Sequence, residues 1–420
     1  MQDVFTLTTG ASGRSMKALC IGLAAALAVP GCAEPQATAA ARAAPREALE
    51  LDEKVGWYRM PAGDTALLTY SASGGLRLFS LGDSVYWATL VAPPQGGLRW
   101  GDVEGPVIEW DHRAGRVAGF RWTAGSGERR QAERLHDYGY RVEEVSVASA
   151  GARLSGSLFL PEVTDRAAPG AVMIHGSGAS DRDNAWYMMI ADALVRDGIA
   201  VLLPDKRGSG KSEGDWFTTD LSGFRDDAAA QLDFLRGHAA IDSARAGLVG
   251  LSQGGHIAPM VAGHSPVAFV VNISGSAVPL AEQIVHEVEQ DMKRDRIPGV
   301  LDPVVRAISL RIIKRRRPEW WETNGPIDPI DHWRGVEVPA LVVYGEDDEL
   351  DNVPVRRSVE RLRSLGRANL DVWVYAGSGH ALWEPDEWRS LPAGGRQRIR
   401  GDFLRRLTEW IHDAVSGAAR

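Results

Sequence analysis

Beyond Tyr140, short apolar runs alternate with stretches of helical length, and no other feature of the sequence constrains the fold as strongly. The runs are almost continuously apolar, as is typical of strands that are buried on both faces of a sheet. They lie at 171–174, 199–204, 246–251, 268–273, 340–344 and 370–375. The helical stretches lie at 186–196, 224–236, 254–262, 355–365 and 398–415. Buried strands separated by helices of this size predict an α/β fold with a doubly wound, mostly parallel sheet.

Residues 51–138 follow a different pattern, in which short apolar runs are broken by turns rich in Gly and Asp. The runs lie at 65–70, 76–81, 85–91, 106–110 and 116–122. Their length and the turns between them predict a small antiparallel β-domain ahead of the α/β domain. No Ser, His and Asp residues in it have catalytic spacing, so we interpret it as a packing or spacer module rather than a binding module.

The predicted α/β domain, residues 139–420, contains one insertion. It opens with two stretches, 141–149 and 153–160, whose polarity alternates as in the strands of a hairpin. Residues 279–333 interrupt the order of strands and helices with two helical runs. Because the insertion lies between two predicted sheet strands, we expect it to form a helical cap.

Ser252 lies at the centre of a G-x-S-x-G pattern, from Gly250 to Gly254. The pattern directly follows a predicted strand and opens a predicted helix. This context is typical of a sharp, strained turn that lifts a nucleophilic serine hydroxyl above the sheet, with small flanking residues because the turn is crowded. The helix behind the serine also favours negative charge at its N-terminus. We therefore predict that Ser252 is a catalytic nucleophile.

A serine hydroxyl needs a general base to act as a nucleophile at neutral pH. His380 follows the last predicted strand, in the order serine, acid, histidine that is typical of such sites. His256 lies one helical turn beyond Ser252, and we interpret it as a packing residue. The sequence therefore predicts His380 as the base.

The base needs a carboxylate that orients the imidazole and stabilises its cation. A cluster of acids follows the predicted strand at 340–344. We choose Asp348 for this role because of its spacing from Gly345, with Asp347 and Asp351 as alternatives.

An oxyanion needs two preorganised N–H donors. We expect one from Gln253, the residue after the nucleophile, and the other from the loop that begins at His175. In that loop we assign Ser177, with Gly178 as the alternative.

Together, five motifs resemble the serine-hydrolase branch of the α/β-hydrolase superfamily. They are His175-Gly176-Ser177-Gly178, the segment 205–212, the elbow 250–254, the turn 345–348 and Gly379-His380. The resemblance covers about residues 141–415 and is closest to bacterial exported carboxylesterases of the serine aminopeptidase-like and dienelactone hydrolase-like groups. It implies that Asp205 and Arg207 form a pair that braces their loop.

The residues and the resemblance lead to one main functional hypothesis and two alternatives. The main one is a carboxylesterase that cleaves acyl esters through a Ser252–Asp348–His380 triad and an acyl-enzyme. The alternatives are a peptidase or amidase of the same fold, and a non-catalytic binding protein of the cell envelope.

No metal or organic cofactor is implied, and the partner is a small-molecule ester or amide. The formal net charge of −8 argues against nucleic acid as a partner. The sequence does not indicate an oligomeric state.

The N-terminal 32 residues have the pattern of an export signal. Residues 16–29 begin with a stretch that carries Lys17 and continue as an apolar run, which is too short to span a membrane stably, and Met16 is a candidate start. The run leads to Gly31-Cys32, which resembles a bacterial lipoprotein lipobox with Cys32 as the lipidated residue. A soluble export signal cleaved nearby is the alternative. Residues 33–50 are rich in Ala, Pro and Arg and read as a tether. The sequence thus predicts export to the cell envelope.

Two features of the cap have alternative interpretations. The Trp320-Trp321 pair could line an apolar acyl pocket, or it could pack the cap onto the sheet, since buried aromatic residues are usually core. The basic run at 311–317 is most often a solvated helix face, and contact with lipid headgroups is the alternative.

Overall fold

The computed structural model describes residues 53–417 except for 62, 64, 71–75, 82–85, 92–98, 101–106, 124–125, 138, 163–165 and 384–396. The predicted signal peptide with Cys32 and the tether at 33–50 lie outside the described residues. In the part of the chain that is described, no helix has the length and apolar character needed to cross a membrane.

An eight-stranded sheet, in the order β16-β15-β14-β13-β11-β12-β10-β9, forms the centre of the molecule. Its strands are β9 (Tyr140–Ser149), β10 (Ala152–Pro161), β11 (Ala168–Ile174), β12 (Ala200–Pro204), β13 (Ile241–Leu251), β14 (Val270–Ile273), β15 (Ala340–Gly345) and β16 (Leu370–Tyr375). Neighbours from β12 to β16 are parallel, whereas β10 is antiparallel to both β12 and β9. The predicted fold class is confirmed, because each predicted buried strand is present in a mostly parallel sheet.

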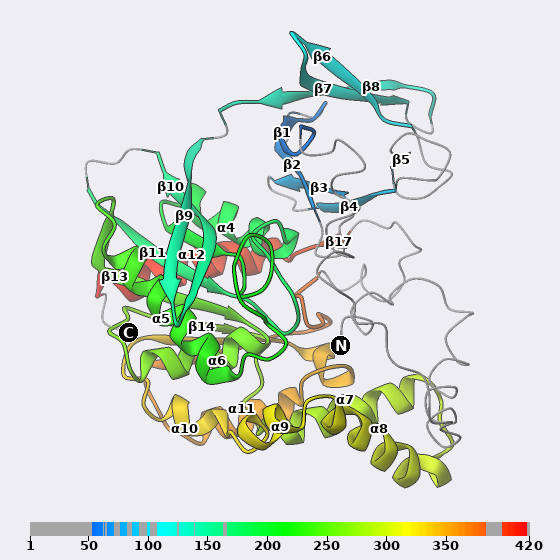
Figure 1. The fold of residues 1–420 in the computed structure, drawn as a ribbon, viewed down its shortest axis with the longest axis vertical. Helices are drawn as coiled ribbons and strands as arrows, with labels where there is room; N and C mark the ends of the chain where they lie inside the picture. Colours follow the sequence, from blue (N-terminus) through cyan, green and yellow to red (C-terminus); the bar gives the residue numbers. More distant parts are fainter. Residues whose placement is uncertain are drawn as a thin grey trace.

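Helices cover both faces of this sheet (Figure 1). The helices are α4 (Ala185–Arg196), α5 (Leu221–Arg236), α6 (Gln253–Ala262), α11 (Val355–Arg363) and α12 (Gly401–Ser416). Side chains alternate along each strand, so Met173 packs in one core with α4 and α12, and Val172 packs in the other with α5, α6 and α11. Burial on both faces explains why these strands are almost continuously apolar.

The strand order reverses around β11. The chain passes from β11 to β12 on one side and then to β13 on the other side of β11. In open α/β sheets, ligands bind outside the carboxyl ends of the strands at such a reversal. The residues that follow β11 and β13 here are His175 and Ser252, so the reversal brings the two predicted catalytic loops to the same edge.

A second sheet is antiparallel and nine-stranded, in the order β17-β4-β3-β2-β1-β8-β7-β6, with β5 paired to β4. Its strands are β1 (Gly56–Arg59), β2 (Thr65–Tyr70), β3 (Leu76–Leu81), β4 (Tyr86–Val91), β5 (Arg99–Trp100), β6 (Glu109–Arg113), β7 (Arg116–Thr123), β8 (Arg129–Leu135) and β17 (Gln397–Arg398). The sequence did not predict β1, β5, β8 or β17. Of these, β17 comes from the C-terminal part of the chain, so the sheet combines both ends of the described chain.

The two faces of this second sheet pack differently. Tyr58 and Leu68 point into a small core of its own, whereas their neighbours Trp57 and Leu67 belong to the core that contains α4. The ring of Trp57 meets that of Tyr140 edge-on, with centroids 5.7 Å apart. One face of the sheet is therefore buried against the α/β part of the molecule.

Residues 279–333 run between β14 and β15 and are described throughout. They form α7 (Leu280–Arg294), α8 (Asp302–Arg316), α9 (Pro318–Asn324) and α10 (Pro329–Trp333), which lie along the lower part of Figure 1. The prediction of two helical runs is wrong, because prolines in the first turns of α9 and α10 start new helices. Helix α10 packs on the sheet core through Trp333, whereas α8 has no buried residue.

Candidate active site

Ser252 occupies the turn between β13 and α6 with φ 53° and ψ −116°. Positive φ is uncommon for any residue other than glycine, and it persists only where surrounding contacts enforce it. Here the N–H of Ser252 donates to the carbonyl of Ile273 on the neighbouring strand (2.8 Å), and the Ser252 carbonyl accepts from Gly255 (2.8 Å). The serine side chain is left half-buried at the carboxyl edge of the sheet.

The glycines around Ser252 are required by close backbone contacts. A Cβ atom on Gly250 would lie 2.1 Å from the carbonyl oxygen of Gly254, and one on Gly254 would lie 2.1 Å from that of Ile174. Both distances are far below van der Waals contact. The G-x-S-x-G spacing thus follows from the packing of the turn against its own helix and against β11.

His380 and Asp348 lie close together at the ends of adjacent strands. The Nδ1 atom of His380 is 2.7 Å from Oδ2 of Asp348, whose side chain is fully buried. Gly345 allows this approach, since a Cβ there would lie 2.2 Å from the carbonyl oxygen of Ser378. Asp351, one of the alternative acids, instead pairs with Arg294. The structure therefore brings together His380 and Asp348, the acid chosen from the sequence.

Asp348 contributes most to raising the pKa of His380. Burial alone would lower the pKa of His380, but the charge of Asp348 and its hydrogen bond to the ring outweigh burial and raise the pKa. A histidine held in this way by a buried carboxylate can take a proton and be stabilised as the cation, as a general base requires.

The loop after β11 is fixed from several sides. His175 Nε2 donates to the carbonyl of Pro204 (2.6 Å), and its Nδ1 accepts from Ser180 Oγ (2.9 Å). Burial lowers the pKa of His175 to about 4, so the ring is neutral and structural. The next N–H, that of Gly176, donates to the hydroxyl of Tyr187 on α4 (2.6 Å). Ser177 and Gly178 then emerge half-buried.

Three positioning residues were missed by sequence reasoning. Ser274 donates from Oγ to the carbonyl of His380 (2.7 Å), and Trp186 donates from Nε1 to that of Ala381 (2.9 Å). Asn272 holds the turn at Gly275 through two hydrogen bonds, 2.7 and 2.8 Å long. The contacts of Ser274 and Trp186 join segments far apart in sequence, whereas those of Asn272 are local, and no motif in the sequence marks any of them.

Lys206 was also missed, although it lies inside one of the motifs. Its buried ammonium donates to the carbonyl of Gly176 (2.6 Å) and to Oε1 of Gln253 (2.8 Å). It therefore contacts both of the segments from which oxyanion donors were predicted.

Asp205 and Arg207, predicted to brace their loop as a pair, do so with other partners. Asp205 accepts from Arg182 through both carboxylate oxygens (3.0 and 2.9 Å). Arg207 pairs with Asp227 on α5. The prediction that the two residues pair with each other is wrong. Each instead has a partner from another segment.

His256, which was interpreted as a packing residue, is buried in α6. Burial lowers its pKa to about 4, and its Nε2 lies 3.3 Å from Ser276 Oγ. Ser276 in turn donates to Gln283 Oε1 on the cap helix α7 (2.7 Å). His256 thus contributes to the contact between α6 and the cap.

Glu287 on α7 brings a further carboxyl group towards the site. Gln283 Nε2 donates to it (3.0 Å). Burial raises the pKa of Glu287 to about 8, and the charges of His380 and Asp348 also act on it. A cap helix thus contributes an acid close to the His380–Asp348 pair, which no sequence motif indicated.

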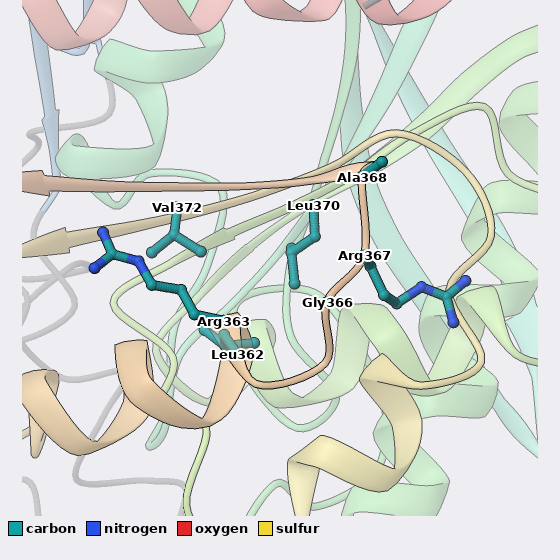
Figure 2. A pocket seen from close by; sticks show the side chains of 7 residues that line it. All are labelled: Leu362, Arg363, Gly366, Arg367, Ala368, Leu370 and Val372. Carbon is teal, nitrogen blue, oxygen red and sulfur yellow. The ribbon is translucent and has the colours of Figure 1, made fainter.

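A depression of about 290 Å³ lies at the opposite edge of the sheet, where β16 begins. Figure 2 shows Leu370 and Val372 on the strand facing the turn after α11, which carries Gly366. His380 follows the other end of β16, so the depression lies apart from the predicted catalytic residues. Among the described residues, no group of three or more His, Cys, Asp or Glu side chains could hold a metal ion.

Comparison with known proteins finds a family and several similar proteins. The family model described as "Alpha/beta hydrolase family" matches residues 171–391. The uncharacterized peptidase YtmA of Bacillus subtilis is 25% identical over 225 residues, which are 52% of this chain and 74% of that protein. The bifunctional esterase/perhydrolase DCH of Acinetobacter calcoaceticus is 25% identical over 273 residues, covering 54% of this chain and 90% of that protein. A solved structure, the Pyrococcus furiosus esterase PF2001, is 19% identical with a TM-score of 0.47 and covers 66% of this chain and 91% of its own.

Proposed function

Because the chain belongs to the alpha/beta hydrolase family, we propose that it is a serine carboxylesterase with Ser252, His380 and Asp348 as its triad. The observation that carries the proposal is the 2.7 Å contact between His380 Nδ1 and the buried Asp348 carboxylate. This pair lies at the same edge of the sheet as the strained turn at Ser252. A nucleophile, a base and an orienting acid in this arrangement are the requirements of acyl transfer.

The proposed reaction has two steps. His380 Nε2 takes the proton of the Ser252 hydroxyl as Oγ bonds to the ester carbonyl carbon, and the oxyanion is held by the N–H groups of Gln253 and Ser177. The carbon–oxygen bond to the alcohol breaks, and the departing alkoxide takes the proton from His380. Water, deprotonated by His380, then bonds to the acyl carbon, the bond from that carbon to Ser252 Oγ breaks, and Oγ takes the proton back from His380 as the acid leaves. Asp348 stabilises the imidazolium in both steps.

A fluorophosphonate probe tests the proposal against a non-catalytic binding protein. We expect covalent labelling of wild type at Ser252 and none of Ser252→Ala. Wild type should also hydrolyse nitrophenyl esters faster than aminoacyl anilides. A folded wild-type protein that neither reacts with the probe nor cleaves any ester would contradict the proposal.

A peptidase or amidase is the second candidate, and Glu287 is the observation that favours it. A carboxyl group near the base could bind the ammonium group of an aminoacyl substrate, and such a cation would ionise it in spite of burial. Glu287→Gln distinguishes the two functions. A loss of kcat/KM on aminoacyl anilides with no change on neutral esters would support the peptidase. If Glu287→Gln keeps the wild-type kcat/KM on both substrates, Glu287 no longer supports the peptidase.

For the N-terminus we propose export with a lipid on Cys32, which is supported by the apolar run that leads to Gly31-Cys32. A palmitate analogue should label the wild type in cells and leave Cys32→Ala unlabelled. Equal labelling of the two, or none of either, would exclude lipidation at Cys32.

A further inference from the structure

Lys206 is a buried cation that no step of the proposed reaction uses. It follows β12, and only 6% of its surface is exposed. Its Nζ atom donates to the Gly176 carbonyl (2.6 Å) and to Gln253 Oε1 (2.8 Å), and it lies 4.3 Å from the centre of the Phe224 ring. All three groups are neutral, so two amide oxygens and the face of an aromatic ring stabilise this ammonium in place of a carboxylate.

The contact with Gly176 bears directly on Ser177. The carbonyl of Gly176 and the N–H of Ser177 belong to one planar peptide group, and the described chain contains no cis peptide bond. In a trans peptide the C=O and N–H point in opposite directions. An ammonium that holds the Gly176 carbonyl therefore fixes the direction of the Ser177 N–H. It also polarises the peptide, which strengthens that N–H as a donor.

The second contact reaches the other expected donor. Gln253 is the first residue of α6, and its N–H is the donor predicted next to the nucleophile. Lys206 holds the side chain of Gln253 and, through the same Nζ atom, the peptide of Gly176. The distance between the two N–H donors thus depends on the Nζ atom of Lys206, which is hydrogen-bonded to both segments.

Keeping a charge in this position is unfavourable for the resting protein. Burial, together with the positive charge of Arg317 from the start of α9, lowers the pKa of Lys206 to about 7. His175, whose pKa is lowered to about 4 by burial and in part by the charge of Lys206, is neutral at that pH. Burying a cation without an anionic partner is costly, and groups with perturbed pKa values cluster at functional sites. Negative charge that develops nearby in the reaction would stabilise it.

We propose that Lys206 is a positioning residue that spaces the two N–H donors of the oxyanion site and polarises the donor from Ser177. The proposal rests on the proposed function, since it requires an oxyanion to form on substrate bonded to Ser252. Lys206 acts through Gly176 and Gln253 and does not itself exchange a proton with the substrate.

Lys206→Met tests this, because it keeps the length of the side chain and removes the donor. We expect kcat for a nitrophenyl ester to fall about 10- to 100-fold with KM nearly unchanged, less than the loss on removing a whole oxyanion donor. A trifluoromethyl ketone, which forms an oxyanion on the serine, should lose affinity by a similar factor, and the matching methyl ketone should not. The control is Lys211→Met, an exposed lysine in the same loop. Unchanged affinity for the trifluoromethyl ketone, or equal loss for both ketones, would overturn the proposal.

Gln253→Leu keeps the test decisive if Lys206→Met does not fold. It removes one partner of Lys206 and leaves the Gln253 N–H in place. We expect the same selective loss to a smaller degree, and no additional loss when both substitutions can be combined. Full retention of trifluoromethyl ketone affinity by Gln253→Leu would count against the inference. Failure of the proposed function gives a different result, because the wild type itself would then neither cleave esters nor bind the ketone.

Discussion

At the scale of single residues, the candidate site depends on groups held where they are unfavourable in isolation. Ser252 is held at positive φ, Asp348 is fully buried, and Lys206 is a desolvated cation. Each is stabilised by a specific partner: a neighbouring strand, His380, and the peptide of Gly176. Such residues are enriched at functional sites, since their strain is tolerated only where the surrounding structure enforces it.

Asp348→Asn should separate the role of the acid from that of its neighbours. We expect kcat to fall by about 10³- to 10⁴-fold, because the amide no longer stabilises the imidazolium. In the wild type, His380 must be neutral to act, and its pKa is raised. Activity should therefore fall as the pH drops through a value above the usual 6.5 of histidine. Without the carboxylate, burial lowers that pKa, so the acid limb of the variant should move to lower pH.

Asp351→Asn provides the matched control, because Asp351 is a partner of Arg294 rather than of His380. Its kcat should stay close to that of the wild type on the same ester, and its acid limb should move to lower pH less than that of Asp348→Asn, because the charge of Asp351 raises the pKa of His380 less than Asp348 does. Loss concentrated at Asp351, with Asp348→Asn close to wild type, would reverse the assignment of the acid.

At this scale, sequence reasoning could propose candidate residues where a reactive side chain lies in a turn with a recognisable sequence pattern. Ser252 and His380 follow strands in a recognisable order. The glycines at 250 and 254 indicate a turn in which these two positions have no room for a Cβ atom. Sequence reasoning did not identify Ser274 or Lys206. Their roles depend on contacts with His380 and Gly176, 106 and 30 positions away in the chain. A single sequence contains no local signal for contacts of that kind.

At the scale of elements, the turn between β13 and α6 requires the small residues on both sides of Ser252. Gly254→Ala should destabilise the protein by about 1–3 kcal/mol or more, because overpacking forces the backbone to shift. Its Cβ would lie 2.1 Å from the carbonyl oxygen of Ile174. Chemical denaturation measures the effect.

Gly263→Ala at the other end of α6 is the control. No atom lies within 3.7 Å of a Cβ placed there, and the backbone has a negative φ of −73°. It should leave stability nearly unchanged. Equal denaturation midpoints for the two variants would show that the close approach at Gly254 is relieved at no cost.

In the cap, the structure favours the packing interpretation of the tryptophan pair. Trp321 is buried, and Trp320 donates from Nε1 to the carbonyl of Thr219 (3.1 Å) while Arg317 stacks on its ring. We expect Trp321→Ala to lower the melting temperature and to reduce kcat/KM equally for short, medium and long acyl esters. A buried Trp→Ala change costs about 3–5 kcal/mol. A loss that grows with acyl length at an unchanged melting temperature would instead make the pair a wall of the acyl pocket.

The strands and helices of the α/β part could be predicted because continuous apolar runs and helical stretches differ in length and pattern. The second sheet was harder. Strand β8 contains three arginines in seven residues and lacks the apolar runs of a typical strand. Strand β17 has two residues, and it is a strand only because it pairs with β4. Tertiary pairing overrides local preference at such positions.

At the scale of the whole molecule, the two sheets share a core. Thr69 on β2 donates to Asp183 just before α4 (3.3 Å), and Trp57 packs in the same cluster as the residues of α4. Helix α4 carries Tyr187, whose hydroxyl accepts from the N–H of Gly176 in the loop that leads to Ser177. A continuous set of contacts therefore links the N-terminal sheet to the candidate oxyanion loop.

This arrangement predicts that the N-terminal sheet supports the thermal stability of the candidate site. Trp57→Ala removes a buried ring from the shared core, at a cost of about 3–5 kcal/mol. The temperature at which ester hydrolysis is lost should therefore fall. Phe120→Ala removes a buried ring of similar burial from the sheet's own core, which does not include α4. Phe120→Ala should lower the inactivation temperature less than Trp57→Ala does, even though it destabilises the sheet. Thermal inactivation of ester hydrolysis, followed beside circular dichroism, separates the two. If both variants inactivate at the wild-type temperature, the sheet is an independent module, and its contact with α4 contributes nothing to the site.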